Sequence, residues 1–183
     1  MTTTTDTITL RALESSDEDA VLAFARGLPK HDLLFARRDL TEPRVVRAWF
    51  EAVEAGEIHS QIAVSGGEIA GYNALIVDPH SWSSHVGEIR IMVGEKYRRH
   101  GVGKMLAQAA FEKALELGLA KLTASMTVDQ HGAIALFEDM GFRGEALLRD
   151  HVKTHEGETC DLAIFSHDMA QGTGRRSMLG LGQ

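Results

Sequence analysis

The sequence predicts a single α/β domain of mixed type, in which helices flank a central, mostly antiparallel sheet that contains one β-α-β crossover. Three observations lead to this prediction. The chain has 183 residues, the length of one ordinary domain. Two apolar runs flank Gly66 and Gly67, which is typical of a β-hairpin. A strand, a glycine loop, a helix and a strand follow one another over residues 88–128, the order of a parallel crossover unit.

The first half of the chain contains the predicted hairpin and two helices. Ser15, with Glu18 three residues later, fits a capping box, and Pro43 suits the first turn of a helix. The predicted elements are a strand at 8–12, a helix from 15 to 27, a charged loop at 30–42, a helix from 43 to 56, and hairpin strands at 60–64 and 68–77.

The second half contains the crossover and a last pair of strands. The predicted elements are a loop at 79–84, a strand at 88–93, a helix at 104–117, a strand at 121–128, a helix at 132–140, and strands at 142–150 and 159–167. We therefore expect a flexible N-terminus at 1–7, one domain at 8–169 and a disordered tail at 170–183.

Composition and charge narrow the function classes. The net charge of −7 argues against a nucleic-acid-binding protein, which usually carries a basic face. A lone cysteine, Cys160, forms no internal disulfide, and the nine histidines show no metal-site spacing, so no metal is expected. The chain begins without a signal-peptide pattern and has no apolar run of about 20 residues, so we expect a cytoplasmic protein without a membrane partner.

A glycine loop, Arg98-Arg99-His100-Gly101-Val102-Gly103, precedes Lys104 and the third predicted helix. A helix N-terminus offers unpaired N–H groups and partial positive charge, and glycine lets a ligand approach the backbone. The loop therefore predicts a phosphate or pyrophosphate site, although a basic surface loop before a capped helix would have the same residues. Met105 and Leu106 stand where the Walker A hydroxyl and the third dinucleotide-binding glycine would be, which excludes both of those loops.

The loop resembles motif A of the GCN5-related N-acetyltransferases (GNATs), Arg/Gln-x-x-Gly-x-Gly/Ala. Residues 88–93 resemble the fourth strand of the family, and residues 133–142 resemble its Ala-Ile-x-Leu-Tyr-Glu-x-x-Gly-Phe segment. Residues 156–161 resemble the glycine turn and aspartate before its last strand. These pieces follow the family order over about residues 7–168, so the resemblance implies the GNAT fold.

The resemblance also implies acetyl-CoA as co-substrate and no metal. In the family, the pantetheine arm lies between the splayed fourth and fifth strands, and the pyrophosphate sits on the glycine loop. The residues that the resemblance implies in coenzyme binding are Met92, Val93, Arg98, Arg99, His100, Gly101, Val102, Gly103, Lys104, Gln130 and Phe137.

The implied reaction is direct attack of a primary amine on the thioester, which requires removal of a proton from the amine. Glu88 matches the position of this base in some relatives, but it could instead form an ion pair with Arg90 or a lysine. Phe137 stands where the family often has a proton-donating tyrosine, and Gln130 where it often has asparagine. Water or another group would then protonate the thiolate, or the thiolate would leave unassisted.

The amine acceptor could be a small molecule or a protein, and a homodimer is possible because relatives are often dimers. We expect the acceptor pocket between the first two helices, their loop and the last hairpin. Asp32 or Asp39 could hold an ammonium group, and Arg37 or Arg38 a carboxylate. The remaining candidates are His31 and Trp82 for the pocket, and Trp49 and Phe50 for the core.

Two other functions fit the same residues. The chain could be a non-catalytic, regulatory acyl-CoA-binding module, which the phenylalanine at position 137 favours. It could also bind an unrelated phosphate ligand through the glycine loop alone.

Overall fold

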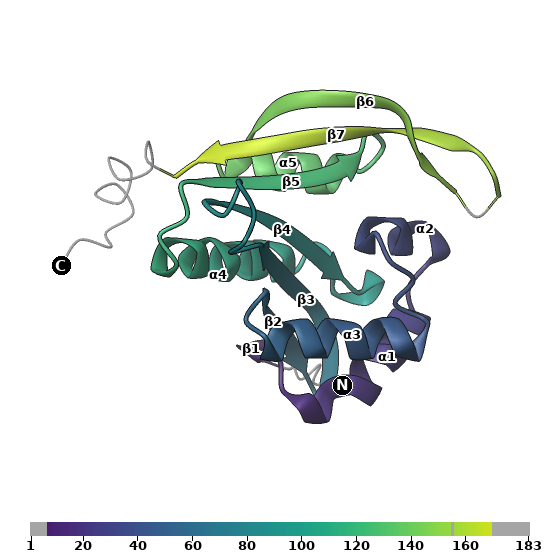
Figure 1. Ribbon diagram of the computed structural model, residues 1–183. Helices are drawn as coiled ribbons and strands as arrows, with labels where there is room; N and C mark the ends of the chain where they lie inside the picture. The colour runs from purple at the N-terminus through teal and green to yellow at the C-terminus, as the bar shows by residue number, and fades with distance from the viewer. Residues whose placement is uncertain (1–6, 155, 170–183) are drawn as a thin grey trace.

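Seven strands form one mixed sheet in the computed structural model, which describes residues 7–154 and 156–169 (Figure 1). The strand order is β1-β2-β3-β4-β5-β7-β6. The strands are β1 (Thr9–Ala12), β2 (Ile58–Ser65), β3 (Glu68–Val77), β4 (Val86–Val93), β5 (Lys121–Thr127), β6 (Arg143–Lys153) and β7 (Thr159–Asp168). β4 and β5 run parallel, and every other neighbouring pair is antiparallel. The predicted fold class, with its single crossover, is confirmed.

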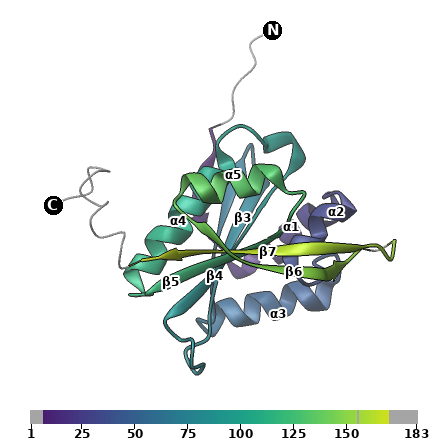
Figure 2. The ribbon, with the colours of Figure 1, turned by 90° about the horizontal axis from the view of Figure 1, so that it is seen from above.

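Helices cover both faces of this sheet (Figure 2). α1 and α3 pack on one face, where Trp49 and Phe50 lie in the core beside Tyr72, as predicted. α4 and α5 pack on the other face, over Leu75 and Leu122. The helices are α1 (Glu18–Arg26), α2 (Lys30–Leu33), α3 (Pro43–Glu54), α4 (Val102–Glu116) and α5 (His131–Asp139), with 3-10 turns η1 (Ser15–Asp17), η2 (Leu34–Ala36) and η3 (Glu95–Tyr97).

The predicted capping box at the first helix is wrong in its residues. Asp17, not Glu18, accepts the backbone N–H of Glu14, at 2.9 Å. The same carboxylate receives both terminal nitrogens of Arg11 at 2.7 Å, and this bidentate pair lowers the pKa of Asp17. A 3-10 turn therefore precedes α1, because Asp17 is held toward β1.

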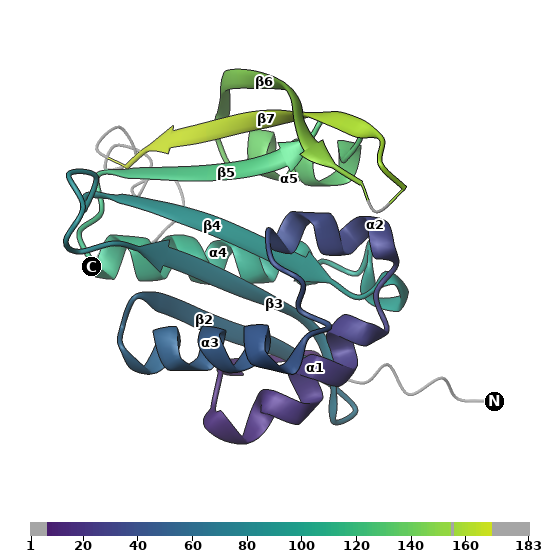
Figure 3. The same ribbon diagram turned by 45° about the vertical axis from the view of Figure 1, so that its right-hand side comes forward.

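The predicted loop at 30–42 is also wrong in part, since it contains α2 and η2. Pro29 is extended and stands just before α2, so the chain re-enters a helix directly after it. α2 lies beside the divergent ends of β4 and β5, and the closed end of the β6–β7 hairpin reaches past it (Figures 1 and 3). Segments expected to form the acceptor pocket are thus neighbours in space.

Trp82 does not line a pocket, contrary to the prediction, because its side chain is fully exposed at 101%. In the described part of the chain, no helix is long and apolar enough to cross a membrane. Residues 1–6 and the predicted disordered tail lie outside the described residues, so the proposed division of the chain stays a prediction.

Candidate active site

The two parallel strands pair over a short distance and then separate. β4 and β5 are in register at Val86 with Lys121, Gly87 with Leu122, and Glu88 with Thr123, where the pairing ends. β4 continues to Val93 and β5 to Thr127. Figure 3 shows the two strands close together at one end and apart at the other. We call this opening, bounded by residues 89–93 and 124–127, the fork.

The β5-facing edge of β4 is open along the fork. β4 stays paired with β3 as far as Gly71 opposite Val93, so its other edge carries the unpaired backbone groups. Backbone N–H and C=O groups removed from water need partners, and an open strand edge accepts an extended ligand by adding hydrogen bonds. The fork therefore suits a narrow, amide-containing chain.

The glycine loop stands at the open end of this fork. Arg99 and Gly101 both have left-handed backbone conformations, with φ of 63° and 80°. The first helical bond of α4 runs from the N–H of Met105 to the carbonyl of Gly101, at 3.0 Å. The N–H groups of residues 102–104 precede that bond and so have no partner within the helix. Together with the exposed Arg98, Arg99, His100 and Lys104, these groups could hold an anion, and their role in binding the coenzyme stays a prediction.

A buried asparagine fixes α4, and with it the loop, against the sheet. Asn73 of β3 is 1% exposed, and its Nδ2 donates to the carbonyl of Leu106 at 2.8 Å. Its amide also exchanges hydrogen bonds with Gln61, at 2.9 and 3.0 Å. Because every polar atom of this amide is paired, the asparagine ties the helix to two strands.

A cluster of polar side chains lies at the closed end of the fork, on the face that α1 and α3 cover. Glu88, at the last paired position, accepts from Arg90 Nε at 3.2 Å and Nη2 at 3.4 Å. Arg37, just after η2, places Nη1 3.4 Å from Glu88 Oε1 and donates from Nη2 to Ser125 Oγ at 2.9 Å. The Arg37 guanidinium thus bridges the two strands where they part.

Two side-chain contacts, one of them an ion pair, hold α2 across the fork. His31 Nε2 lies 2.8 Å from a carboxylate oxygen of Asp129, which follows β5. Asp32 pairs with Arg98 of the glycine loop. The Thr127 hydroxyl donates to Asp129 and lowers the pKa of that carboxyl, and His31 adds to the effect. α2 is therefore held to the segment that follows β5, through Asp129, and to the segment that follows β4, through Arg98.

The remaining candidates lie around the same opening. The Met92 side chain is buried in the core, so its backbone is the part available to a ligand, and Val93 is half-buried at the end of β4. Gln130 stands immediately before α5. Phe137 is 4% exposed and packs edge-to-face on Phe142 with ring centroids 5.0 Å apart. Their coenzyme contacts stay predictions.

The acceptor candidates divide into those that reach the fork and those that do not. Arg37 reaches it, whereas Asp39 caps its own turn by accepting from the N–H of Thr41 at 3.0 Å. Arg38 is exposed beside them. Sequence reasoning missed Ser125, since no local pattern distinguishes it from any other strand serine.

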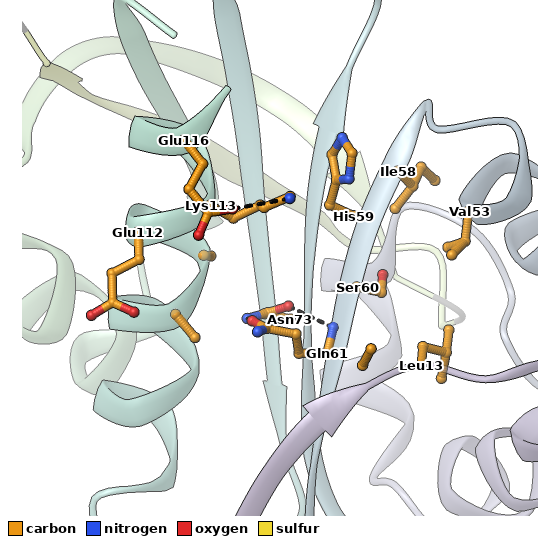
Figure 4. Close-up of a pocket in the computed structure, with 13 residues that line it drawn as sticks. Leu13, Val53, Ile58, His59, Ser60, Gln61, Asn73, Glu112, Lys113 and Glu116 are labelled. Atoms are coloured by element: carbon orange, nitrogen blue, oxygen red, sulfur yellow. Dashed lines mark hydrogen bonds and ion pairs between the residues drawn. The ribbon is translucent and has the colours of Figure 1, made fainter. Parts of the chain in front are cut away.

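A hollow of about 370 Å³ lies away from the fork, between the C-terminal half of α4 and the edge of β2 (Figure 4). Its lining includes His59, Gln61, Asn73 and Lys113, and none of the residues predicted to bind coenzyme. Burial lowers the pKa of His59, and Lys113 adds to this effect. Within residues 7–154 and 156–169, no three His, Cys, Asp or Glu side chains group as a metal site would require.

A sequence profile described as the Acetyltransferase (GNAT) family matches residues 17–142, which is more than half of the chain. The chain belongs to the GNAT family. One curated relative, N-acetyltransferase 8 of Rattus norvegicus, is 32% identical to this GNAT chain over 91 residues. That match covers 48% of this chain and 41% of the rat protein, so it spans about two fifths of the length of that relative.

Solved structures of GNAT proteins share the fold. An N-acetyltransferase from Staphylococcus aureus Mu50 has a TM-score of 0.77 at 18% identity, covering 89% of this chain and 99% of that one. A ribosomal-protein-alanine N-acetyltransferase from Brucella melitensis has a TM-score of 0.75 at 21% identity, covering 87% of this chain and 99% of that one. The structure of yncA from Salmonella typhimurium, solved with its cofactor acetyl-CoA, has a TM-score of 0.74 at 18% identity, covering 88% of this chain and 94% of that one. These identities are low, so the likeness establishes the GNAT fold alone.

Proposed function

We propose that this GNAT chain is an N-acetyltransferase that transfers the acetyl group of acetyl-CoA to a primary amine by direct attack. The geometry of the fork is the main observation that supports this proposal. Two parallel strands that pair at three positions and then part, with a glycine-lined helix N-terminus at the open end, suit a ligand that joins an extended amide chain to a pyrophosphate.

The residues of the site fit acetyl-CoA. The open edge of β4 at Met92 and Val93 would pair with the pantetheine amides, and the N–H groups that begin α4 would hold the pyrophosphate. A Cβ built on Gly103 would meet Leu136 Cδ2 at 3.4 Å and Val93 Cγ2 at 3.7 Å, so the start of α4 packs closely against the end of β4 and against α5. Gln130, which precedes α5, and Phe137, on the buried face of α5, would lie beside the bound coenzyme.

Glu88 is the proposed general base. The reaction joins the amine nitrogen to the acetyl carbon and breaks the carbon–sulfur bond, with the electron pair leaving on the thiolate. Glu88 would take the amine proton directly or through one water, because its side chain is 22% exposed and its arginine contacts, at 3.2–3.5 Å, are long. A carboxylate has about four acceptor positions, so these contacts leave room for another donor.

Phe137 cannot supply a proton to the departing thiolate. It carries no hydroxyl and is buried against Phe142. A thiol with an ordinary pKa of about 8.5 leaves as an anion near neutral pH, so water is sufficient to protonate it later. The proposed mechanism therefore needs a base but no dedicated acid.

Thiol release from acetyl-CoA, measured with a panel of amines and checked by mass spectrometry of the products, tests the proposal. Glu88→Gln should lower kcat by about 10²–10⁴-fold while acetyl-CoA binding is kept, the contribution usual for a general base. Glu112→Gln, an exposed glutamate on α4, is the matched control and should change neither quantity. Acetyl-CoA binding without acetylation of any amine would contradict catalysis and favour a binding module. Unchanged turnover in Glu88→Gln would remove Glu88 as the base.

A further inference from the structure

Positive charge gathers at the closed end of the fork, on the side from which an amine would approach. Arg37 and Arg90 both contact Glu88, so two guanidinium groups face one carboxylate. The cluster therefore carries a net charge of about +1, in a chain whose net charge is −7. This local excess of positive charge disfavours the binding of an acceptor that carries only positive charge.

The nearby acidic residues have other partners. Asp32 pairs with Arg98, and Asp129 pairs with His31 and accepts from the Thr127 hydroxyl. They do not contact Arg37 or Arg90, so the excess positive charge of the cluster is not neutralised within hydrogen-bond distance by the described residues.

Arg37 has hydrogen-bonding capacity to spare. Its Nη1 contacts Glu88 and its Nη2 donates to Ser125 Oγ, which uses one hydrogen of each terminal nitrogen. A guanidinium has five N–H donors, so the Nε–H and one hydrogen on each terminal nitrogen of Arg37 have no partner among the described residues. Its side chain is 44% exposed, which makes these donors reachable from solvent.

The position of Arg37 is fixed by both the backbone and its contacts. The residue adopts a left-handed conformation with φ of 56° as it ends η2, a conformation that costs energy for a side chain other than glycine. Arg90 donates to the carbonyl of Ala36 at 3.4 Å and so supports the preceding turn. The guanidinium is therefore held over the point where β4 and β5 part.

We propose that Arg37, supported by Arg90, binds a carboxylate of the acceptor, and that the acceptor is therefore a free α-amino acid or a close derivative. This inference rests on the proposed N-acetyltransferase function and names its substrate class. An α-amino acid carries its amine and carboxylate on one carbon, so a carboxylate on Arg37 places the amine beside Glu88 and the fork. A protein N-terminus, a lysine side chain of a protein or a polyamine brings no carboxylate to that position.

The test compares amines that differ in the carboxylate alone. The kcat/KM for acetylation is measured for a panel of α-amino acids and for the matching α-carboxamides, with a polyamine and a short peptide as further acceptors. Charge-assisted hydrogen bonds to one guanidinium predict that the best free acid exceeds its amide by about 10- to 100-fold. Arg37→Gln should reduce this ratio to near one, mainly by raising the KM of the acid.

Matched variants separate recognition from a merely structural role. Arg44→Gln removes an exposed arginine on α3 and should leave the acid-to-amide ratio unchanged. Arg37→Lys should restore part of the acid-to-amide ratio, because the lysine ammonium keeps the positive charge but cannot make the two parallel hydrogen bonds of a guanidinium. Acetyl-CoA affinity should be the same in all three variants.

The outcomes distinguish this inference from the proposed function. Amides, peptides or polyamines acetylated as well as the acids would overturn the inference and leave N-acetyltransfer intact. An equal loss for acid and amide in Arg37→Gln would also overturn it, by showing that Arg37 only positions the site. Acetyl-CoA binding with no thiol release from any amine would overturn both.

Discussion

Reversing the charge of Lys104 separates a ligand site from a simple helix start. Lys104 is the third residue of α4 and is exposed in the first turn of that helix, whose N–H groups at residues 102–104 have no partner within the helix. Because the side chain is exposed, Lys104→Glu leaves the packing of the fork unaltered. It places a negative charge beside the position proposed for the pyrophosphate.

The structure gives opposite signs for the two effects of Lys104→Glu. A negative charge in the first turn of a helix is favoured over a positive one by about 0.3–1 kcal/mol, so the ligand-free protein should be as stable as the wild type or slightly more stable. The same charge repels a pyrophosphate, and a loss of about 1–2 kcal/mol weakens acetyl-CoA binding about 5- to 30-fold. At an acetyl-CoA concentration of about 100 times the wild-type Kd, the stabilisation by the ligand should fall from about 2.7 to about 1.4 kcal/mol for a tenfold loss of affinity.

Thermal melts with and without acetyl-CoA, together with a calorimetric titration, measure both effects. Arg44→Glu is a matched control, because Arg44 is an exposed cation in the first turn of another helix, α3. The control should keep its acetyl-CoA affinity. An unchanged affinity in Lys104→Glu would refute the placement of the pyrophosphate against this turn, and a large loss of ligand-free stability would refute the argument from the helix terminus.

Two further predictions concern the sheet and the hollow beside β2. Gly71→Ala would place a Cβ 2.5 Å from the carbonyl oxygen of Met92, a backbone atom that cannot swing aside. It should lower the free energy of unfolding by about 1–3 kcal/mol in a urea titration, and wild-type stability would contradict the close approach of β3 to β4. His59 has a lowered pKa in the folded state, so its contribution to stability is complete above its unfolded pKa of about 6.5 and is lost as the pH falls through the folded value. Urea midpoints at pH 7.5 and 5.5 should therefore differ more for the wild type than for His59→Gln, whereas equal differences would show that His59 is not the cause.

The sequence predicted the fold well where the signals are local. Gly66 and Gly67 form the turn between β2 and β3, with positive φ of 57° and 83°, as two adjacent glycines between apolar runs suggest. The sequence predicts the helix after the glycine loop at 104–117, and the helix begins slightly earlier, at Val102, because the left-handed Gly101 already starts it. Such features depend on residues within one or two turns of each other.

The rest of the site depends on contacts that no local pattern records. Arg37 and Ser125 are 88 positions apart, and their hydrogen bond exists only because η2 packs over the parting strands. α2 has four residues, too few to show a helical period, so the sequence indicated a loop. The place where β4 and β5 part is a matter of register, which is set by packing across the whole sheet.

The central claim is that the fork and the glycine loop together hold acetyl-CoA, and a thermal melt with acetyl-CoA, CoA and ADP tests it most directly. At about 100 times Kd, acetyl-CoA should stabilise the protein by about 2.7 kcal/mol, which is a rise of about 5–10 °C for a domain of this size. CoA should act similarly and ADP far less, because ADP has no arm to lie along β4. An equal rise with ADP would show that the loop binds phosphate without the fork. No rise with any of the three would contradict the account.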